Sequence, residues 1–449
     1  MSELIERALT TATDTKAVLA EPGAIARIGE VYRATFPGRT ALVVGDERTM
    51  QVAGDAVVEA LRADGVNLAD PYVFPGAPEL YARYENCELL REVLRDQDVV
   101  AVAVGAGTLN DLVKRASGEL GRPYLVVATA ASMDGYTAFG SSIAVGGYKQ
   151  TLDCPAPAAC LSDWTVLAAA PAVMTASGYG DLLGKVTAGA DWIVADALGV
   201  EAVDPAVWEL VQGPLRASLA RPEALAAGDL AATGELAEGL IMSGLAMQAA
   251  ASSRPASGAE HLFSHLWEME GHGVDITPRR LSHGFKVAVG SVAVAALYER
   301  LLERDLSALD VDAAVAAWPS AEQLEERVRA AHQPHLADEI VAQSLAKYAD
   351  ADALAVRLTR LTGAWPRLKD RLAGQLIGAA ELQRMLRAAG APAHPFDIEL
   401  TWQEFRDTYR RAQMIRKRYT VLDLVYEANL ATELVEELFA PNGFWGGQS

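Results

Sequence analysis

The amino-terminal third of the chain alternates between short apolar runs and amphipathic segments. Residues 40–46 (TALVVGD) form a β-branched apolar run, and residues 54–66 then carry apolar positions at three- to four-residue spacing. A second apolar run at 98–107 is followed by a helix-like stretch at 109–117, and a third run lies at 123–132. Runs that are apolar on both faces are typical of parallel strands covered by helices. The pattern therefore predicts a Rossmann-like α/β domain with nucleotide-binding potential.

The pattern changes near residue 170. Segments rich in alanine and leucine follow, with helical periodicity and almost no strand-like alternation, at 181–199, 234–250 and 286–305. Residues 320–438 continue as helices separated by breaks that contain proline or glycine. The sequence therefore predicts an all-helical second domain, with domains at residues 1–170 and 171–449.

Composition and charge exclude several kinds of partner. Hydrophobic residues make up 51% of the chain, too many for a disordered protein. The net charge of −20 argues against binding to nucleic acid or an anionic membrane, because both require a cationic surface. The apolar stretches fall short of the ~20 residues that span a bilayer, and the acidic amino terminus has no signal-peptide pattern. Three cysteines without metal-ligand spacing, Cys87, Cys154 and Cys160, fit a reducing compartment. We therefore expect a cytoplasmic protein without membrane insertion.

A glycine-rich turn (VAVGAGTLNDL) joins the second predicted strand to its helix. Gly105 and Gly107 permit close approach of the backbone to a ligand, and the helix that follows offers N–H groups at its positive end. A pyrophosphate would fit there, with Thr108 and Asn110 adding hydrogen bonds; an ordinary tight turn is the alternative. The usual dinucleotide fingerprint has an acidic residue ~20 residues after the glycines. Here the best acid at a strand end is Asp46, upstream, so the turn is not the ordinary Rossmann arrangement.

A loop of small hydroxyl residues (TAASMDGYTAFGSS, 129–142) follows the third predicted strand. Asp134 and Gly135 within it are typical of a turn. The carboxyl end of a parallel strand is also where α/β sheets bind ligands. Both interpretations of this loop stay open.

Four polar residues of the helical region could act together. Singly, Asp181 is interpreted as a carboxylate that opens and caps a helix. His261 and His265 are interpreted as partly exposed helix residues, and His283 as a loop residue before a helix. Together, one aspartate and two histidines near helix starts form an N/O donor set suited to Zn²⁺ or another divalent transition metal. Three protein ligands leave an open position, as catalytic metal sites do.

Two further histidines, His332 and His335, flank Pro334 in the sequence HQPH. We expect a loop there and interpret both histidines as solvated surface residues.

The whole set of motifs resembles the metal-dependent polyol dehydrogenase and dehydroquinate-synthase-like superfamily, and within it the bacterial sn-glycerol-1-phosphate dehydrogenases. The resemblance covers essentially the whole chain in order. Its segments are GAGTLNDLVK (105–114), TAASMDGYT (129–137), GYGDLLGK (178–185), RPASGAEHLFSH (254–265), SHGFKVAVG (282–290) and RKRYTVLDL (416–424).

The resemblance implies a fold and a metal site. It implies a Rossmann-like amino-terminal domain, a helical carboxy-terminal domain and an active site in the cleft between them. The metal, Zn, Ni or Fe, would be held by Asp181, His261 and His283. His265 and Asp134 would contact the substrate and serve as catalytic residues, and Asp181 would also lie at the substrate.

The resemblance also implies where a nicotinamide cofactor binds. The pyrophosphate would lie at the glycine-rich turn, and the adenosine ribose at Asp46. A carboxylate there would repel a 2′-phosphate, so NAD is expected in preference to NADP, although NADP use stays open. The cofactor contacts expected besides Asp46 are Gly105, Gly107, Thr108, Asn110, Asp111, Thr129 and Ser132.

The activity that the resemblance implies is the reversible NAD(H)-linked reduction of dihydroxyacetone phosphate to sn-glycerol 1-phosphate. His265, or a water that it holds, would donate the proton. Arg254 and Lys286 are candidates for the phosphate by proximity in sequence. A cofactor-binding serine of the family is replaced by Ala138, so this contact is missing or moved to Thr137.

Three other functions stay open. One is a polyol dehydrogenase for a non-phosphorylated substrate. The second is a sugar-phosphate cyclase of the dehydroquinate synthase type, which Asp181 disfavours because that group usually offers glutamate as the acidic ligand. The third is a non-enzymatic scaffold, which leaves the aspartate–histidine set unexplained. For the enzyme we expect a small phosphorylated substrate and a homo-oligomer, a dimer or larger.

Overall fold

The computed structural model describes residues 3–146, 148–274 and 281–448. The chain divides into two compact units. The first holds Met1–Leu182, Ala206–Ser253 and Ala388–Ala391, and the second holds Leu183–Pro205, Arg254–Arg387 and Pro392–Ser449. The boundary at residue 170 that the sequence predicts stays a prediction.

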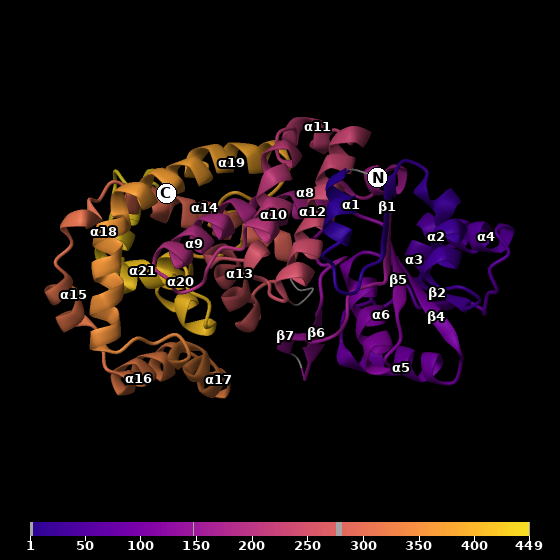
Figure 1. Cartoon of the computed structure of the whole chain (residues 1–449), viewed down its shortest axis with the longest axis horizontal. Helices are drawn as coiled ribbons and strands as arrows, with labels where there is room; N and C mark the ends of the chain where they lie inside the picture. The colour runs from indigo at the N-terminus through magenta and orange to yellow at the C-terminus, as the bar shows by residue number, and fades with distance from the viewer. Residues whose placement is uncertain (1–2, 147, 275–280, 449) are drawn as a thin grey trace. The chain divides into compact units, whose positions relative to one another are not determined.

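The first unit is built on a parallel sheet of six strands (Figure 1). Its order is β1-β8-β5-β4-β2-β3, and every neighbouring pair is parallel. The sheet confirms the α/β prediction. Its strands are β1 (Ala17–Glu21), β2 (Thr40–Asp46), β3 (Tyr72–Phe74), β4 (Val99–Gly105), β5 (Tyr124–Ala128) and β8 (Ala159–Asp163).

Helices cover both faces of this sheet because its central strands are apolar on both sides. All seven residues of β4 are buried. Val100, Val102 and Val104 belong to one core cluster with Ile28 of α2 and Leu61 of α4. Helix α6 packs against β4, β2 and β5, and α5 packs on α6. Figure 1 shows α2 and α4 together, apart from α5 and α6. The helices are α2 (Ile28–Thr35), α4 (Asp55–Ala63), α5 (Tyr84–Arg95) and α6 (Gly107–Glu119).

The rest of the first unit adds a hairpin and more helices. The antiparallel pair β6–β7, which the hydrophobic pattern does not predict, follows the loop after β5 and lies against α5 and α6. These elements are α1 (Glu3–Leu9), α3 (Glu47–Thr49), β6 (Ser141–Val145), β7 (Tyr148–Leu152), α7 (Trp164–Ala168), α8 (Ala172–Leu183), α10 (Pro205–Ser218), α11 (Pro222–Ala226) and α12 (Leu230–Ala250).

Within its described residues, the second unit contains helices and no strand, as the sequence predicts. Its helices are α9 (Lys185–Ala197), α13 (Ala259–Met269), α14 (His283–Leu302), α15 (Val311–Ala317), α16 (Ala321–Ala331), α17 (Pro334–Leu345), α18 (Ala351–Gln375), α19 (Ala379–Ala388), α20 (Trp402–Arg411), α21 (Val421–Glu427) and α22 (Ala431–Phe439), with short 3₁₀ turns η3 (Arg254–Ala256), η4 (Leu306–Ala308), η5 (Pro395–Ile398), η6 (Ala412–Ile415) and η7 (Gly446–Gln448).

Helices α13 and α14 pack closely because a glycine lies at their contact. A Cβ added at Gly290 would come within 2.6 Å of the Glu260 carbonyl oxygen, which belongs to the backbone and cannot move alone. Any larger residue would therefore push the two helices apart. The close approach matters because the two helices carry the three clustered histidines.

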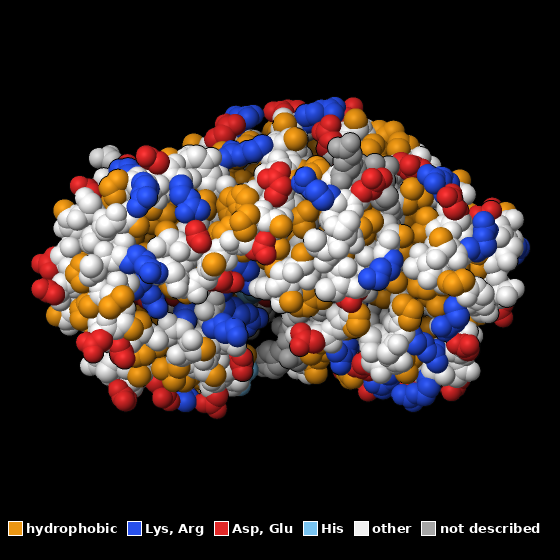
Figure 2. All heavy atoms as spheres, viewed as in Figure 1, with side chains coloured by type: hydrophobic (Ala, Val, Ile, Leu, Met, Phe, Trp, Pro, Cys, Tyr) orange, Lys and Arg blue, Asp and Glu red, His pale blue; other side chains and the backbone are white. Residues whose placement is uncertain are grey.

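The surface carries charges of both signs. Figure 2 shows acidic and basic side chains interspersed over the viewed face. Among the helices that the structure describes, none combines the length and the apolar character needed to cross a bilayer.

Candidate active site

Asp181, His261 and His283 form a compact set of possible metal ligands. One donor atom from each residue lies within 4.8 Å of the other two. Asp181 and His261 are buried, and His283 is partly exposed. The interpretation of Asp181 as a helix-opening cap is wrong, because it lies near the carboxyl end of α8. The backbone N–H of Asp134 donates a hydrogen bond to Oδ2 of Asp181 at 3.0 Å, and this bond fixes the Asp181 carboxylate in place.

The orientation of His261 is set by its neighbour Glu260. His261 Nδ1 lies 2.8 Å from Glu260 Oε1, which also accepts from the N–H of Gly258. The Thr187 hydroxyl donates to Glu260 Oε2 at 2.7 Å. Burial raises the pKa of Glu260, but the hydrogen bonds from His261, Thr187 and Gly258 outweigh it, and the net shift is downward. An ionised Glu260 can only accept, so the proton of His261 lies on Nδ1 and Nε2 presents its lone pair to a metal.

His283 has a similar arrangement on the next helix. It is the first residue of α14, whose cap Ser282 accepts from the N–H of Phe285. Its Nδ1 lies 3.1 Å from the Ser264 hydroxyl and 3.2 Å from Glu268 Oε1. With Nδ1 held by these groups, Nε2 is the ring nitrogen left for a metal.

His265 lies one helical turn after His261 and completes a group of three rings. Its ring centroid is 6.0 Å from that of His261 and 5.7 Å from that of His283. Its Nδ1 is buried and has no hydrogen-bond partner within the described chain. Burial, and then the positive charge of Arg416, hold the pKa of His265 well below its usual value. The imidazole is therefore neutral at neutral pH, and one of its nitrogens has no hydrogen-bond partner among the described residues.

A divalent metal fits this donor set. One carboxylate and two imidazoles are ligands that Zn²⁺, Ni²⁺ and Fe²⁺ accept, and hydrogen bonds to carboxylates orient both imidazoles. The partnerless nitrogen of His265 beside them is what a ligand-binding site leaves open for its ligand.

The loop that carries Asp134 is held by buried polar groups of the first unit. Lys114 is 1% exposed, and its ammonium donates to the carbonyls of Gly135 at 2.9 Å, Ala138 at 2.7 Å and Gly140 at 3.0 Å. Burial lowers the pKa of Lys114. The sequence reasoning did not identify Lys114, because only the fold brings these carbonyls to it. Asp134 itself accepts a hydrogen bond at Oδ2 from the Ser243 hydroxyl at 2.9 Å.

The glycine-rich turn has the geometry of an anion site. Helix α6 begins at Gly107, and in the part of the chain that the structure describes no side chain caps it. A Cβ at Gly105 would lie 2.4 Å from the Leu109 side chain, so the turn requires glycine there. Thr108 is partly exposed at the start of the helix. A phosphate group would find unpaired N–H groups and the positive end of the helix at this turn.

Other expected cofactor residues are placed differently. Asn110 is 1% exposed, and its amide group bonds the Gly135 carbonyl and the Tyr124 hydroxyl, so its side chain serves the fold. The Asp111 carbonyl accepts from Ser141, while the Asp111 side chain is partly exposed.

Thr129 and Ser132 follow β5. Thr129 is 7% exposed, and its N–H donates to the Gly105 carbonyl, which ties the two predicted cofactor segments together. Ser132 is partly exposed near the Tyr136 hydroxyl. Asp46 ends β2 and caps α3, accepting the N–H groups of Arg48 and Thr49 at Oδ1.

Several lesser expectations are wrong. Arg254 is 1% exposed and donates to the carbonyls of Tyr419 and Asp191. Lys286 is also 1% exposed and pairs with Glu268 at 3.4 Å. Neither side chain is therefore available to a phosphate. Thr137 is fully buried and donates to the Ile241 carbonyl, so it cannot replace the missing serine contact.

The expectation for the HQPH segment is also half wrong. His332 is 7% exposed, because it follows the last turn of α16 and packs inward, while His335 is exposed in the first turn of α17.

Comparisons with known proteins agree with this architecture. A family model described as iron-containing alcohol dehydrogenase matches residues 19–171. The chain is 37% identical over 57% of its length to a protein of Halalkalibacterium halodurans named glycerol-1-phosphate dehydrogenase [NAD(P)+], and the match spans 64% of that relative. Proteins of the same name from Geobacillus thermodenitrificans and Bacillus subtilis are 32% and 33% identical, over 69% and 72% of this chain and 71% and 83% of theirs.

Solved structures share the fold at lower identity. A probable glycerol dehydrogenase from Sinorhizobium meliloti is 17% identical with a TM-score of 0.59, and the match covers 94% of this chain and 97% of that one. A 1,3-propanediol oxidoreductase is 17% identical with a TM-score of 0.58, over 95% and 98% of the two chains. These likenesses support the two-part architecture of a parallel sheet followed by helices.

Proposed function

Because the chain belongs to the glycerol-1-phosphate dehydrogenase family, we propose that it is an NAD(H)-linked, metal-dependent oxidoreductase that reversibly reduces dihydroxyacetone phosphate to sn-glycerol 1-phosphate. The observation that carries the proposal is the set of Asp181, His261 and His283, whose donor atoms lie within 4.8 Å of one another. When bound, the nicotinamide cofactor supplies hydride and the metal supplies Lewis acidity toward a ketone oxygen.

The residues of the chain divide the remaining work. Asp181, His261 and His283 would hold the metal, and Glu260 orients His261 for this task. The hydrogen bond from the Asp134 N–H to Asp181 ties the loop after β5 to this ligand, which supports a substrate-contacting role for Asp134. The expectation that the substrate binds in a cleft between two domains stays a prediction.

Reduction of the ketone also requires a proton at its oxygen. The neutral imidazole of His265 is suited to hold a water and pass on its proton, since a neutral ring has both a donor and an acceptor nitrogen. Its orphaned Nδ1 supports this role, because a buried ring nitrogen is normally paired.

The cofactor preference that we propose is NAD over NADP. Asp46 keeps its carboxylate at the end of β2, where its negative charge would repel a 2′-phosphate. The turn at Gly105–Thr108, with its uncapped helix, would bind the pyrophosphate, helped by Thr129 and Ser132 from the neighbouring strand end.

The test is NADH oxidation by metal-stripped protein reloaded separately with Zn²⁺, Ni²⁺ or Fe²⁺, supplied with dihydroxyacetone phosphate or dihydroxyacetone. We expect a much higher kcat/KM for the phosphorylated ketone, and a product oxidised again by this enzyme but not by an enzyme specific for sn-glycerol 3-phosphate. Preference for dihydroxyacetone would favour a polyol dehydrogenase. Absence of net NADH oxidation with every metal would contradict the proposal and favour a cyclase.

A further inference from the structure

We propose that Arg416 is the residue that binds the phosphate group of the substrate, an inference that rests on the proposed function. Arg416 follows the 3₁₀ turn η6, which packs against α13, the helix that carries His261 and His265. Its guanidinium donates one hydrogen bond in the described structure, at 3.3 Å to the Ile415 carbonyl, and it enters none of the ion pairs found there.

Three other cations of the described helical unit already have partners. The Arg254 guanidinium donates hydrogen bonds to two backbone carbonyls, and Lys286 forms an ion pair with Glu268. Arg418 donates to the Ser257 carbonyl at 2.9 Å and lies in the field of Glu201 and Glu260. Arg416 therefore differs from all three, because its guanidinium has one weak hydrogen bond and no ion pair among the residues that the structure describes.

A half-buried guanidinium that forms no ion pair within the described part of the chain favours an anion. Burial lowers the pKa of Arg416, with a smaller opposing effect from Glu339, but an arginine stays protonated in proteins. Its planar fork matches phosphate oxygens with two parallel hydrogen bonds. A phosphate ester would supply the negative charge and the hydrogen-bond acceptors that the Arg416 guanidinium does not find among the described residues.

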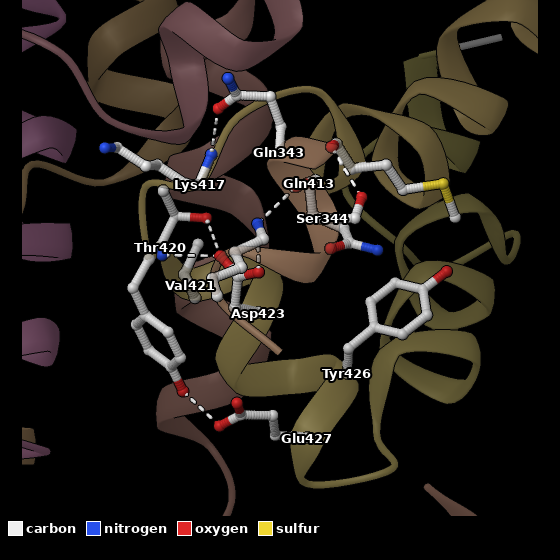
Figure 3. A network of polar contacts seen from close by, with 12 residues as sticks. Gln343, Ser344, Gln413, Lys417, Thr420, Val421, Asp423, Tyr426 and Glu427 are labelled. Atoms are coloured by element: carbon white, nitrogen blue, oxygen red, sulfur yellow. Dashed lines mark hydrogen bonds and ion pairs between the residues drawn. The ribbon is translucent and has the colours of Figure 1, made fainter. Parts of the chain in front are cut away.

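Polar contacts hold the chain on both sides of Arg416, at Gln413 and Lys417 (Figure 3). The N–H of Lys417 donates to Gln343 Oε1 at 3.0 Å, and Lys347 bonds the Gln413 carbonyl and pairs with Asp423 at 2.6 Å. Asp423 in turn accepts from the N–H and hydroxyl of Thr420. A side chain on such a fixed segment loses less conformational freedom when it binds a ligand.

The position of Arg416 suits the proposed chemistry. The turn η6, which Arg416 follows directly, packs against α13, the helix that carries His265, the residue proposed to serve the reacting oxygen. In dihydroxyacetone phosphate one methylene and the ester oxygen separate the ketone carbon from phosphorus. A residue that holds this phosphate must therefore lie near the group that serves the ketone, and the packing of η6 on α13 meets this requirement for Arg416 and His265.

The test compares Arg416→Met, Arg416→Lys and the matched control Lys417→Met in the metal-loaded enzyme. Lys417 is the exposed neighbour, and no side-chain bond of it occurs in the described structure. We expect Arg416→Met to raise the KM for dihydroxyacetone phosphate about 100-fold, as the loss of one partner of a desolvated charge pair does. The KM values for dihydroxyacetone and NADH should change less than twofold. Arg416→Lys should raise the KM for dihydroxyacetone phosphate less than Arg416→Met does, and Lys417→Met should have the KM values of the wild type.

A second readout separates this proposal from the proposed function. Inorganic phosphate should raise the Tm of the wild type and of Lys417→Met, but not that of Arg416→Met. Failure of the wild type to reduce dihydroxyacetone phosphate would contradict the proposed function, while the phosphate-dependent Tm would still test Arg416. An unchanged KM in Arg416→Met, an equal loss with dihydroxyacetone, or a phosphate effect that survives in Arg416→Met would overturn the assignment.

Discussion

The Glu260 carboxylate and the ring of His261, adjacent in sequence on α13, meet through a 2.8 Å hydrogen bond at Nδ1. Neighbouring helix residues point in different directions, so this contact exists because Glu260 is also held by the Gly258 N–H and the Thr187 hydroxyl. The bond fixes which ring nitrogen of His261 faces the other two candidate ligands.

Glu260→Gln should therefore weaken metal binding without removing a ligand. The amide has no negative charge and can turn its NH₂ toward Nδ1, so the ring loses its fixed tautomer. We expect the dissociation constant for Zn²⁺ to rise about 10- to 100-fold, the usual effect of losing such a carboxylate. Competition with a chromophoric chelator measures it. Glu326→Gln, at an exposed position of α16, is the control, and an unchanged constant in Glu260→Gln would show that the contact does not orient the ligand.

His261→Ala and His265→Ala should separate metal binding from proton transfer, the two roles proposed for histidines of α13. Removing His261 takes away one of three ligands, so the metal content after dialysis should fall below a tenth of the wild-type value. Removing His265 should leave the metal content unchanged and lower kcat by about 10²- to 10⁴-fold, the range of a lost proton-transfer group. Atomic-emission analysis and NADH oxidation measure the two quantities. Equal loss of metal in both variants would sink the assignment of roles.

Lys114→Met should lower stability through the loop that follows β5. The buried carbonyls of Ala138 and Gly140 lose their donor, while that of Gly135 keeps the bond from Asn110, and an unsatisfied buried acceptor costs about 1–3 kcal/mol. Relief from burying the ammonium offsets part of this cost, so we expect the free energy of unfolding to fall by about 2–4 kcal/mol. Urea denaturation measures it, with Lys369→Met at a partly exposed position of α18 as the control. A variant as stable as wild type would mean that the ammonium only offsets its own desolvation.

The sheet could be predicted only where strands are long and apolar. The runs that form β2, β4 and β5 are β-branched and buried on both faces. Strand β3 has three residues, and the fully buried β8 (ACLSD) contains one large aliphatic residue. Strand β8 is buried because it lies between β1 and β5, and this placement depends on the tertiary structure and not on the local sequence.

In the candidate site too, some residues can be predicted from the sequence and others only from the folded structure. Only the family resemblance selects Asp181, His261 and His283 as the ligand set, because single residues far apart in sequence carry no sign of contact. Glu260 and Lys114 were missed because a carboxylate beside a histidine, or a lysine in a helix, is ordinarily solvated. Their roles depend on partners such as Thr187 and Gly140 that only the folded chain brings within hydrogen-bonding distance.

The pH dependence of stability tests whether the His332 ring is buried in the folded protein. The sequence predicts a surface residue, but the ring is buried, and burial, with the charge of Arg411, lowers its pKa to about 4 from the usual value near 6.5. Between these values the unfolded chain binds a proton that the folded chain does not, so the contribution of His332 to stability is complete above pH 6.5 and is lost as the pH falls toward 4. His332→Leu should therefore flatten the decline of unfolding free energy over this window, by up to about 1.4 kcal/mol per pH unit. Urea denaturation from pH 4.5 to 7 measures the slope, with Gln333→Leu at the exposed neighbour as the control. If His332→Leu and wild type decline in parallel, the ring is solvated in the folded protein, as the sequence alone predicts.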